Sequence, residues 1–161
     1  MIQKKKAKKL SPSGLFDHRF EPLGEINGIS FINDSGSIRV GDTWTTLHGL
    51  ECGKNVIWIM GGSDSGIDYG VLESLVYAKV KGIVCLSHDS GRIQRRFQRE
   101  SPFFVKALSV EEAVGCALAY GSSGDIALLS PACPGFDLVD NFRGRGEEFR
   151  AAFVNFYNNL P

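Results

Sequence analysis

The sequence has no excess charge of either sign, since 18 lysines and arginines balance 18 aspartates and glutamates. A general nucleic-acid binder relies on a positive field to attract phosphates, so this balance argues against a nucleic-acid partner. No apolar run is long enough to cross a bilayer, and we expect no membrane association. The five lysines within residues 1–9 are not followed by the apolar stretch of a signal peptide, so we expect a cytoplasmic protein.

The chain also lacks the cysteine and histidine patterns of a metal centre. Its four cysteines, Cys52, Cys85, Cys116 and Cys133, form no C-x-x-C pair, and no histidine stands at ligand spacing from them. We therefore predict free thiols in a reducing compartment and no metal site.

Composition divides the chain into a tail and one domain. Residues 1–14 hold the lysine run and a short Ser-Pro-Ser-Gly segment, which predicts a basic disordered tail and linker. Residues 15–161 are long enough to bury roughly 70% of their unfolded surface, so a core needs no disulfide or metal support. We expect this stretch to form a single domain.

Hydrophobic patterning in residues 15–161 predicts alternating strands and helices. Asn27-Gly28 separates two apolar runs and predicts a hairpin, because both central residues of a type I′ turn need positive φ. The pattern indicates an α/β fold, a Rossmann-like and mostly parallel sheet with helices on both faces and an N-terminal β-hairpin. The further strands are expected at Val56–Met60, Gly82–Leu86, Phe103–Val105 and Ile126–Leu129, and the helices at Val71–Lys79, Arg92–Arg99, Ser109–Tyr120 and Glu147–Tyr157.

Three loops rich in small and polar residues follow predicted strands, at 33–37, 61–66 and 130–135. Open parallel sheets bind ligands beyond the carboxyl ends of their strands, so we expect the three loops to share one site. The glycine-rich loop at 61–66 has the backbone freedom of a phosphate-binding loop but no lysine, and a tight turn explains its glycines equally well. The expected helix Arg92–Arg99 has a cationic face, which suits solvent exposure or an acidic partner.

Four ordered motifs give the chain a family resemblance. They are His18-Arg19-Phe20-Glu21; Phe31-Ile32-Asn33-Asp34-Ser35; Gly61-Gly62-Ser63-Asp64-Ser65-Gly66-Ile67-Asp68-Tyr69; and Leu129-Ser130-Pro131-Ala132-Cys133 with Phe136-Asp137, Asn141-Phe142, Arg145-Gly146 and Phe149. The sequence from about residue 18 to residue 149 resembles the C-terminal domain of the Mur ligases, most closely the branch that adds D-glutamate in peptidoglycan synthesis.

The resemblance implies a domain that works with others. In complete Mur ligases a central domain binds ATP and Mg²⁺, and the C-terminal domain presents the incoming amino acid. The implied nucleotide-side contacts in this chain are His18, Arg19 and Asp34. The chain has no phosphate loop, so we expect no catalytic residue, no tight binding of ATP or Mg²⁺ to this chain alone, and possible partnership in trans with N-terminal and central Mur-ligase domains.

The implied amino-acid pocket departs from the family pattern. Its positions are Ser35, Gly36, Ser65, Gly135, Phe136 and Phe142. Gly36 and Ser65 stand where the family has lysines, and Gly135 where it has a serine; Ile38 also replaces a threonine. Each lost charge-assisted contact is worth roughly 1.5–3 kcal/mol, so two losses weaken binding by about a hundredfold or more. We therefore expect a ligase domain that is inactive alone; the alternative is a pseudoenzyme, a non-catalytic binding or interaction module whose pocket has drifted.

Overall fold

The computed structural model describes residues 18–61, 66–134 and 142–161, and the expected tail at 1–14 lies outside them. In the described residues one six-stranded sheet has the order β1-β2-β6-β3-β4-β5. β1 pairs antiparallel with β2, and every other neighbouring pair is parallel. The strands are β1 (Glu21–Ile26), β2 (Ile29–Asn33), β3 (Val56–Gly61), β4 (Val80–Leu86), β5 (Phe104–Ala107) and β6 (Ile126–Leu129).

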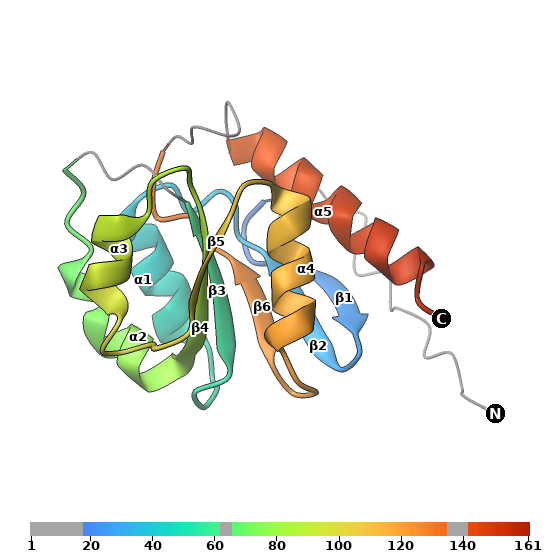
Figure 1. Cartoon of the computed structure of the whole chain (residues 1–161), viewed down its shortest axis with the longest axis horizontal. Coiled ribbons are helices and arrows are strands. Elements are labelled where there is room, and N and C mark those ends of the chain that lie inside the picture. The colour runs from blue at the N-terminus through green and yellow to red at the C-terminus, as the bar shows by residue number, and fades with distance from the viewer. Residues whose placement is uncertain (1–17, 62–65, 135–141) are drawn as a thin grey trace.

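Helices cover both faces of the sheet, as the sequence predicted. Figure 1 shows α1, α2 and α3 on one face and α4 and α5 on the other. The helical segments are α1 (Val40–Gly49), the 3₁₀ turn η1 (Gly70–Leu72), α2 (Glu73–Lys79), α3 (Gly91–Phe97), α4 (Val110–Tyr120) and α5 (Phe142–Asn158). The predicted fold class is confirmed.

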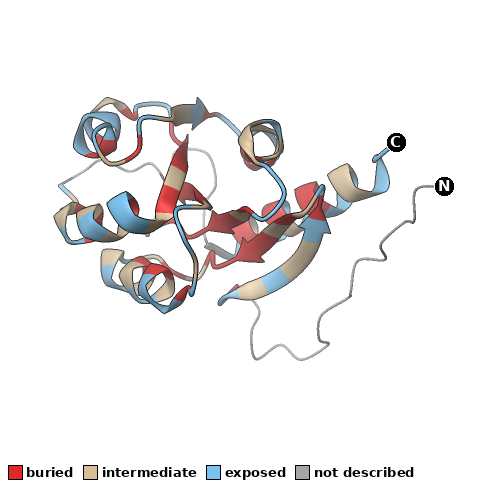
Figure 2. Cartoon of the chain, turned by 90° about the horizontal axis from the view of Figure 1, so that it is seen from below, coloured by how far each residue is buried: buried red, intermediate tan, exposed pale blue. Residues whose placement is uncertain are grey.

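The alternation of side chains along the strands creates two hydrophobic cores. In β3, Ile57 and Ile59 belong to the core under α4 and α5, whereas Trp58 belongs to the core under α1, α2 and α3. All three side chains are fully buried, as expected of a strand covered on both faces. Figure 2 shows the buried strands between helices whose outer sides are exposed.

The N-terminal hairpin has the predicted turn. Asn27 and Gly28 adopt φ values of 53° and 79°, and Ile26 pairs directly with Ile29. A Cβ atom on Gly28 would collide with the side chain of Ser123, so this glycine is required by both backbone conformation and space.

The structure differs from the sequence-based expectation in one whole element, α1. The segment Val40–Gly49 has three threonines and glycines near both ends, which lower helix propensity and hide its apolar stripe. α5 begins at Phe142, earlier than the expected Glu147, because Gly144 and Gly146 obscure its first turns. α3 ends at Phe97, two residues before the expected Arg99.

All four cysteines are free thiols, as predicted. Cys85 and Cys133 are buried, and burial raises the pKa of the partly exposed Cys52 and Cys116 thiols. None of the helices in the described residues combines the length and apolarity that a membrane span requires.

Candidate functional site

The chain segments that follow β2 and β6 meet the end of β3 at one edge of the sheet, which we call the carboxyl edge. The three strands are neighbours, with Leu129 paired both to Asn33 and to Ile59. Backbone hydrogen bonds tie the loops together: Asp34 N–H donates to Leu129 (2.8 Å), Gly61 N–H to Pro131 (2.9 Å) and Ala132 N–H to Ser37 (2.9 Å). The structure therefore brings the described residues of the loops at 33–37 and 130–135 to Gly61, and residues 62–65 and 135 lie outside the described residues.

Asp34 is the centre of this edge. Its carboxylate is 2% exposed and accepts four hydrogen bonds from its own chain. Oδ2 accepts from three hydroxyls, and Oδ1 accepts from the backbone N–H of Phe20 at 3.1 Å. The three hydroxyl donors to Oδ2 are Ser37 (2.6 Å), Thr46 (2.7 Å) and Ser130 (2.8 Å).

Two threonines of α1 extend this network. Thr46 donates directly to Asp34, and Thr43 Oγ1 lies 2.8 Å from Ser130 Oγ. Because the Ser130 hydroxyl proton points to Asp34, Thr43 donates to Ser130, which forms a chain of hydroxyls ending on the carboxylate. Trp58 Nε1 fixes the same loop by donating to the Ser130 carbonyl at 2.7 Å. Sequence reasoning missed Thr43 and Thr46 because it missed their helix.

A carboxylate has about four lone-pair sites, two on each oxygen. On Asp34, Oδ2 accepts three hydrogen bonds and Oδ1 accepts one. The implied role of Asp34 as an acceptor of ribose hydroxyls stays a prediction. The geometry supports a structural role for Asp34. Its buried carboxylate links the ends of β2 and β6, helix α1 and the segment before β1 through hydrogen bonds.

His18 and Arg19 enter this edge from the start of the described chain. The His18 ring lies against Ser35, with Nδ1 and Oγ 3.1 Å apart, and the side chain is 9% exposed. Gly146 of α5 leaves room for that ring, because a Cβ atom there would collide with His18 Nδ1 and Ser35 Oγ. Arg19 is exposed and is the one implied nucleotide-side residue with a side chain open to solvent.

Gly36 lies under the chain segment that carries His18. Its N–H donates to the His18 carbonyl at 2.6 Å, and a Cβ atom at residue 36 would stand 2.7 Å from that same oxygen. Since the obstacle is backbone, no side chain fits at this position unless the segment shifts. The absence of a lysine here is thus built into the local backbone.

An ion pair anchors α5 to the hairpin beside this edge. Arg150 donates to both oxygens of Glu21, at 2.8 Å and 2.9 Å, in a forked arrangement. Asn33 joins them, with Nδ2 donating to Glu21 at 3.2 Å and to the Gly146 carbonyl at 3.3 Å. These bonds fix the start of α5 over β2.

Arg145 is a fully buried cation at the same edge. Its Nη2 donates to the Cys133 carbonyl at 3.2 Å, and Nη1 lies 3.9 Å from Cys133 Sγ. Burial lowers the pKa of Arg145 from its ordinary value to about 10, and the neighbouring Cys133 partly offsets that effect. The site therefore contains a positive charge, but one that is enclosed within the protein.

Strained backbone concentrates here. Positive φ values occur at the non-glycine residues His18 (63°), Phe20 (44°) and Ala132 (59°). Such conformations are costly for residues with a Cβ atom and persist only where the surroundings impose them. Their clustering at the carboxyl edge marks it as the candidate functional site.

The remaining residues of the implied pocket are described only in part. Ser65, Gly135 and Phe136 lie outside the described residues, Ser35 is buried beside His18, and Phe142 is the first residue of α5. In the described part of the chain, no group of three or more acidic, histidine or cysteine side chains is arranged to hold a metal ion.

Comparison with solved structures gives the class. The fold is shared with a murein peptide ligase, Mpl, from Psychrobacter arcticus (TM-score 0.58, 16% identity), covering 89% of this chain and 30% of that one. It also matches a domain from a putative UDP-N-acetylmuramate ligase of Haemophilus ducreyi (TM-score 0.50, 13% identity), covering 83% of this chain and 98% of that one. The architecture is that of a single Mur ligase domain.

Comparison of sequences gives the relatives. The chain is 39% identical over 138 residues to the UDP-N-acetylmuramoylalanine–D-glutamate ligase of Porphyromonas gingivalis. The match covers 86% of this chain and 30% of that enzyme, so the chain spans about a third of the length of the curated relative. No family model matched the sequence. The chain belongs to the Mur ligases and corresponds to their C-terminal domain.

Proposed function

We propose that the chain is the amino-acid-presenting domain of an ATP-dependent ligase that acts on a UDP-N-acetylmuramoyl substrate and D-glutamate in peptidoglycan synthesis. We further propose that it works in the cytoplasm and has no turnover alone. The observation that carries the proposal is the 39% identity over 138 residues to a UDP-N-acetylmuramoylalanine–D-glutamate ligase. The segments around His18, Ser37 and Ser130 meet at the buried Asp34, which gives this chain a formed carboxyl edge.

The proposed lack of independent turnover follows from what phosphoryl transfer requires. That reaction depends on groups that hold and orient the triphosphate, among them a phosphate loop with its lysine. The sequence has no G-x-x-x-x-G-K-[ST] motif, and the Asp34 carboxylate accepts four hydrogen bonds from its own chain. ATP and Mg²⁺ are supplied with the other domains in this account.

A turnover assay tests this part. The full chain is mixed with ATP, Mg²⁺, UDP-N-acetylmuramoylalanine and D-glutamate, and phosphate release and amide formation are followed. We expect neither product above a blank without protein. Amide formation that scales with the concentration of this chain would contradict the proposal.

Partnership in trans has a separate test. The N-terminal and central domains of the Porphyromonas gingivalis ligase are prepared without the matched C-terminal third and assayed with and without this chain. Rescue of that fragment by its own C-terminal domain is the control. Restored amide formation on adding this chain supports docking, whereas a fragment that only its own domain rescues counts against it.

A second candidate function, a binding module with no part in ligation, is favoured by one observation. A Cβ atom at Gly36 would meet backbone 2.7 Å away, so the edge is closed to the lysine that the family has there. Calorimetric titration with D-glutamate and L-glutamate separates the two functions. Saturable binding of D-glutamate in preference to L-glutamate supports the amino-acid-presenting domain, and no preference favours the binding module.

A further inference from the structure

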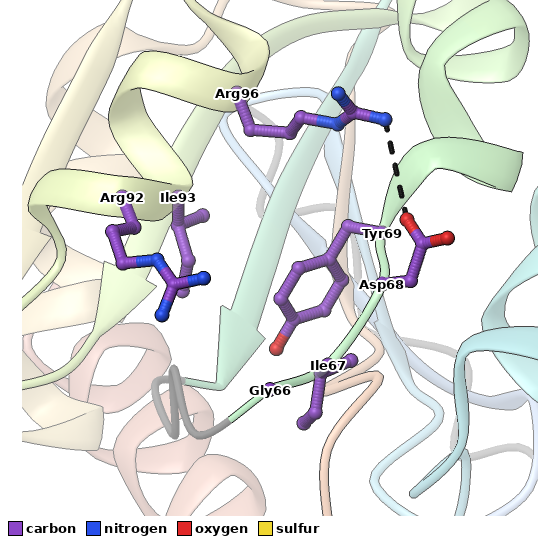
Figure 3. A pocket seen from close by; sticks show the side chains of 7 residues that line it. All are labelled: Gly66, Ile67, Asp68, Tyr69, Arg92, Ile93 and Arg96. Atoms are coloured by element: carbon purple, nitrogen blue, oxygen red, sulfur yellow. Dashed lines mark ion pairs between the residues drawn. The ribbon is translucent and has the colours of Figure 1, made fainter.

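Two arginines line a pocket of about 350 Å³ between α3 and the segment that follows β3. Figure 3 shows the guanidinium groups of Arg92 and Arg96 extending in different directions, with Arg96 toward Asp68. Arg96 is also paired with Glu73, with Nε and Oε1 3.2 Å apart. These two cations do not converge on one anion, whereas the carboxyl edge holds a cation that is open to a ligand.

That cation is Arg19, and it differs from two arginines nearby. Arg145 is fully buried and donates to the Cys133 carbonyl, and Arg39 donates to both oxygens of Asp42, at 3.1 Å each. Arg19 is exposed, and no hydrogen bond or ion pair joins its side chain to another residue in the part of the chain that the structure describes. Its guanidinium therefore keeps its N–H donors for a ligand.

The backbone on both sides of Arg19 is fixed to the loop after β2. The His18 carbonyl accepts from the N–H of Gly36 at 2.6 Å, and the N–H of Phe20 donates to Asp34 Oδ1 at 3.1 Å. His18 and Phe20 have positive φ values of 63° and 44°, a conformation that persists where the surroundings impose it. The point at which the Arg19 side chain leaves the backbone is thus set before any ligand binds.

The side chain of Arg19 lies over Gly36. A Cβ atom at residue 36 would stand 3.4 Å from Arg19 Cδ and 3.3 Å from Arg19 Nε. A larger side chain at residue 36 would therefore crowd Arg19 as well as the His18 carbonyl. Glycine at this position leaves the space in which the guanidinium begins, on the surface of the loop at 33–37.

From these contacts we propose that Arg19 binds a carboxylate group of the acceptor amino acid. The inference rests on the proposed function, in which this domain presents D-glutamate, a dicarboxylate. A guanidinium can donate two parallel N–H bonds to one carboxylate, and Arg19 has no ion pair with a described residue to break first. The family resemblance implies a nucleotide-side contact for Arg19, but its Nε lies against Gly36, a position of the implied amino-acid pocket. This placement makes Arg19 a specificity-determining residue for the acceptor.

Titration of the full, isotope-labelled chain followed by NMR tests the proposal, with glutarate, D-glutamate and ADP as separate probes. We expect glutarate and D-glutamate to shift the signals of the Arg19 Nε–H and the Gly36 amide until the shifts saturate. Saturable shifts with ADP alone, or with none of the three probes, would overturn the proposal. Glutarate is achiral, so its binding at Arg19 is independent of the preference for D-glutamate that tests the proposed function.

Variants assign the binding to Arg19. Arg19→Gln should weaken glutarate binding by about tenfold or more, since it removes a charge-assisted contact. Arg19→Lys keeps the charge and should recover part of the affinity. Arg39→Gln is the matched control, because it removes the same charge from a side chain already bonded to Asp42, and binding should stay within about twofold of the parent. Equal weakening by Arg19→Gln and Arg39→Gln would indicate a general charge effect and overturn the proposal.

The unfolding of Arg19→Gln separates lost binding from lost structure. Because the Arg19 side chain has no bond to another described residue, this variant should unfold at the same urea concentration as the parent. Unfolding at a lower concentration would show that Arg19 is engaged within the fold, and would overturn the proposal.

The same titrations distinguish this inference from the proposed function. Undiminished glutarate binding by Arg19→Gln would overturn the role of Arg19, even if the parent prefers D-glutamate to L-glutamate. Glutarate binding that is lost in Arg19→Gln would support the role of Arg19, even if the parent shows no such preference.

Discussion

At the scale of single residues, the carboxyl edge is organised by buried charges that serve the protein itself. Asp34 collects four donors, and Arg145 lies fully buried beside Cys133. Burying a charge is costly unless hydrogen bonds replace its water. Both residues are therefore expected to influence stability strongly.

Asp34→Asn should destabilise the fold by about 2–4 kcal/mol, because an amide keeps the shape but loses the charge and turns one acceptor into a donor. Urea unfolding followed by tryptophan fluorescence measures the change. Glu148→Gln, at an exposed position of α5, is the control and should change the free energy of unfolding by less than about 0.5 kcal/mol. Equal effects of the two variants would contradict the central role of Asp34.

The lowered pKa of Arg145 predicts that the stability of the folded chain rises with pH above about pH 9. The pKa of Arg145 is about 10 in the folded protein and higher in the unfolded chain, so the unfolded chain binds more protons as the pH rises past 10. The penalty for burying the charge is fully present below pH 10 and is relieved as the pH rises through the folded pKa. The wild-type chain should therefore gain about 1 kcal/mol relative to Arg145→Met between about pH 9 and pH 11.

Urea unfolding of the two proteins across this range gives the difference directly. Groups that titrate in both, such as tyrosines and lysines, cancel in the comparison. The lowered pKa of Arg145 would be refuted if the difference in unfolding free energy between the two proteins stays constant, or moves in favour of the variant, as the pH rises.

At the scale of elements, α1 and α5 hold the edge from opposite faces of the sheet. α1 contributes hydroxyls to Asp34 and Ser130, and α5 contributes the gap at Gly146 that His18 occupies. Each contact can be tested by a substitution, with a helix position that lacks the contact as the control.

Thr46→Val should cost about 1–2 kcal/mol, since it removes a hydroxyl donor to a buried carboxylate with little change of shape. Thr45→Val is the matched control, because Thr45 is exposed and bonds only to the Gly41 carbonyl of its own helix. Chemical unfolding of both variants measures the change in the free energy of unfolding. If Thr45→Val proves as costly as Thr46→Val, helix propensity rather than the network explains the loss.

Gly146→Ala should destabilise the protein, although alanine normally stabilises a helix by about 0.5–1 kcal/mol relative to glycine. The methyl group would collide with His18 and Ser35. Gly115→Ala in α4 is the control, because its Cβ atom would make an ordinary contact at 3.5 Å with Phe156, and we expect a gain there. A gain in thermal stability at both positions would show that His18 is not seated against α5.

Much of this architecture could be predicted from the sequence, for physical reasons. Val56–Gly61 is apolar throughout because both of its faces are covered, and Asn27-Gly28 supplies the positive φ values that the turn needs. α1 could not be predicted, because its inward face includes Thr43, a polar residue whose role depends on Ser130, 87 residues away. The meeting of the segments after β2 and β6 was predictable from topology, but the four hydrogen bonds that Asp34 accepts from its own chain required coordinates.

At the scale of the whole molecule, the chain is one layered α/β unit that matches part of a longer enzyme. In the described residues, its two hydrophobic cores lie on opposite faces of the sheet, beneath the helices that cover each face. At the described part of the site, Asp34 and Arg145 are bonded within the domain, and the sequence has no phosphate loop. This combination suits the proposed acceptor-presenting domain.

The assay of ligation by this chain alone tests that account most directly. The purified chain is incubated with ATP, Mg²⁺, UDP-N-acetylmuramoylalanine and D-glutamate, and the amide product is measured by mass spectrometry. We predict no product at any concentration of the chain. Product that increases in proportion to the chain and disappears when ATP is omitted would contradict the account.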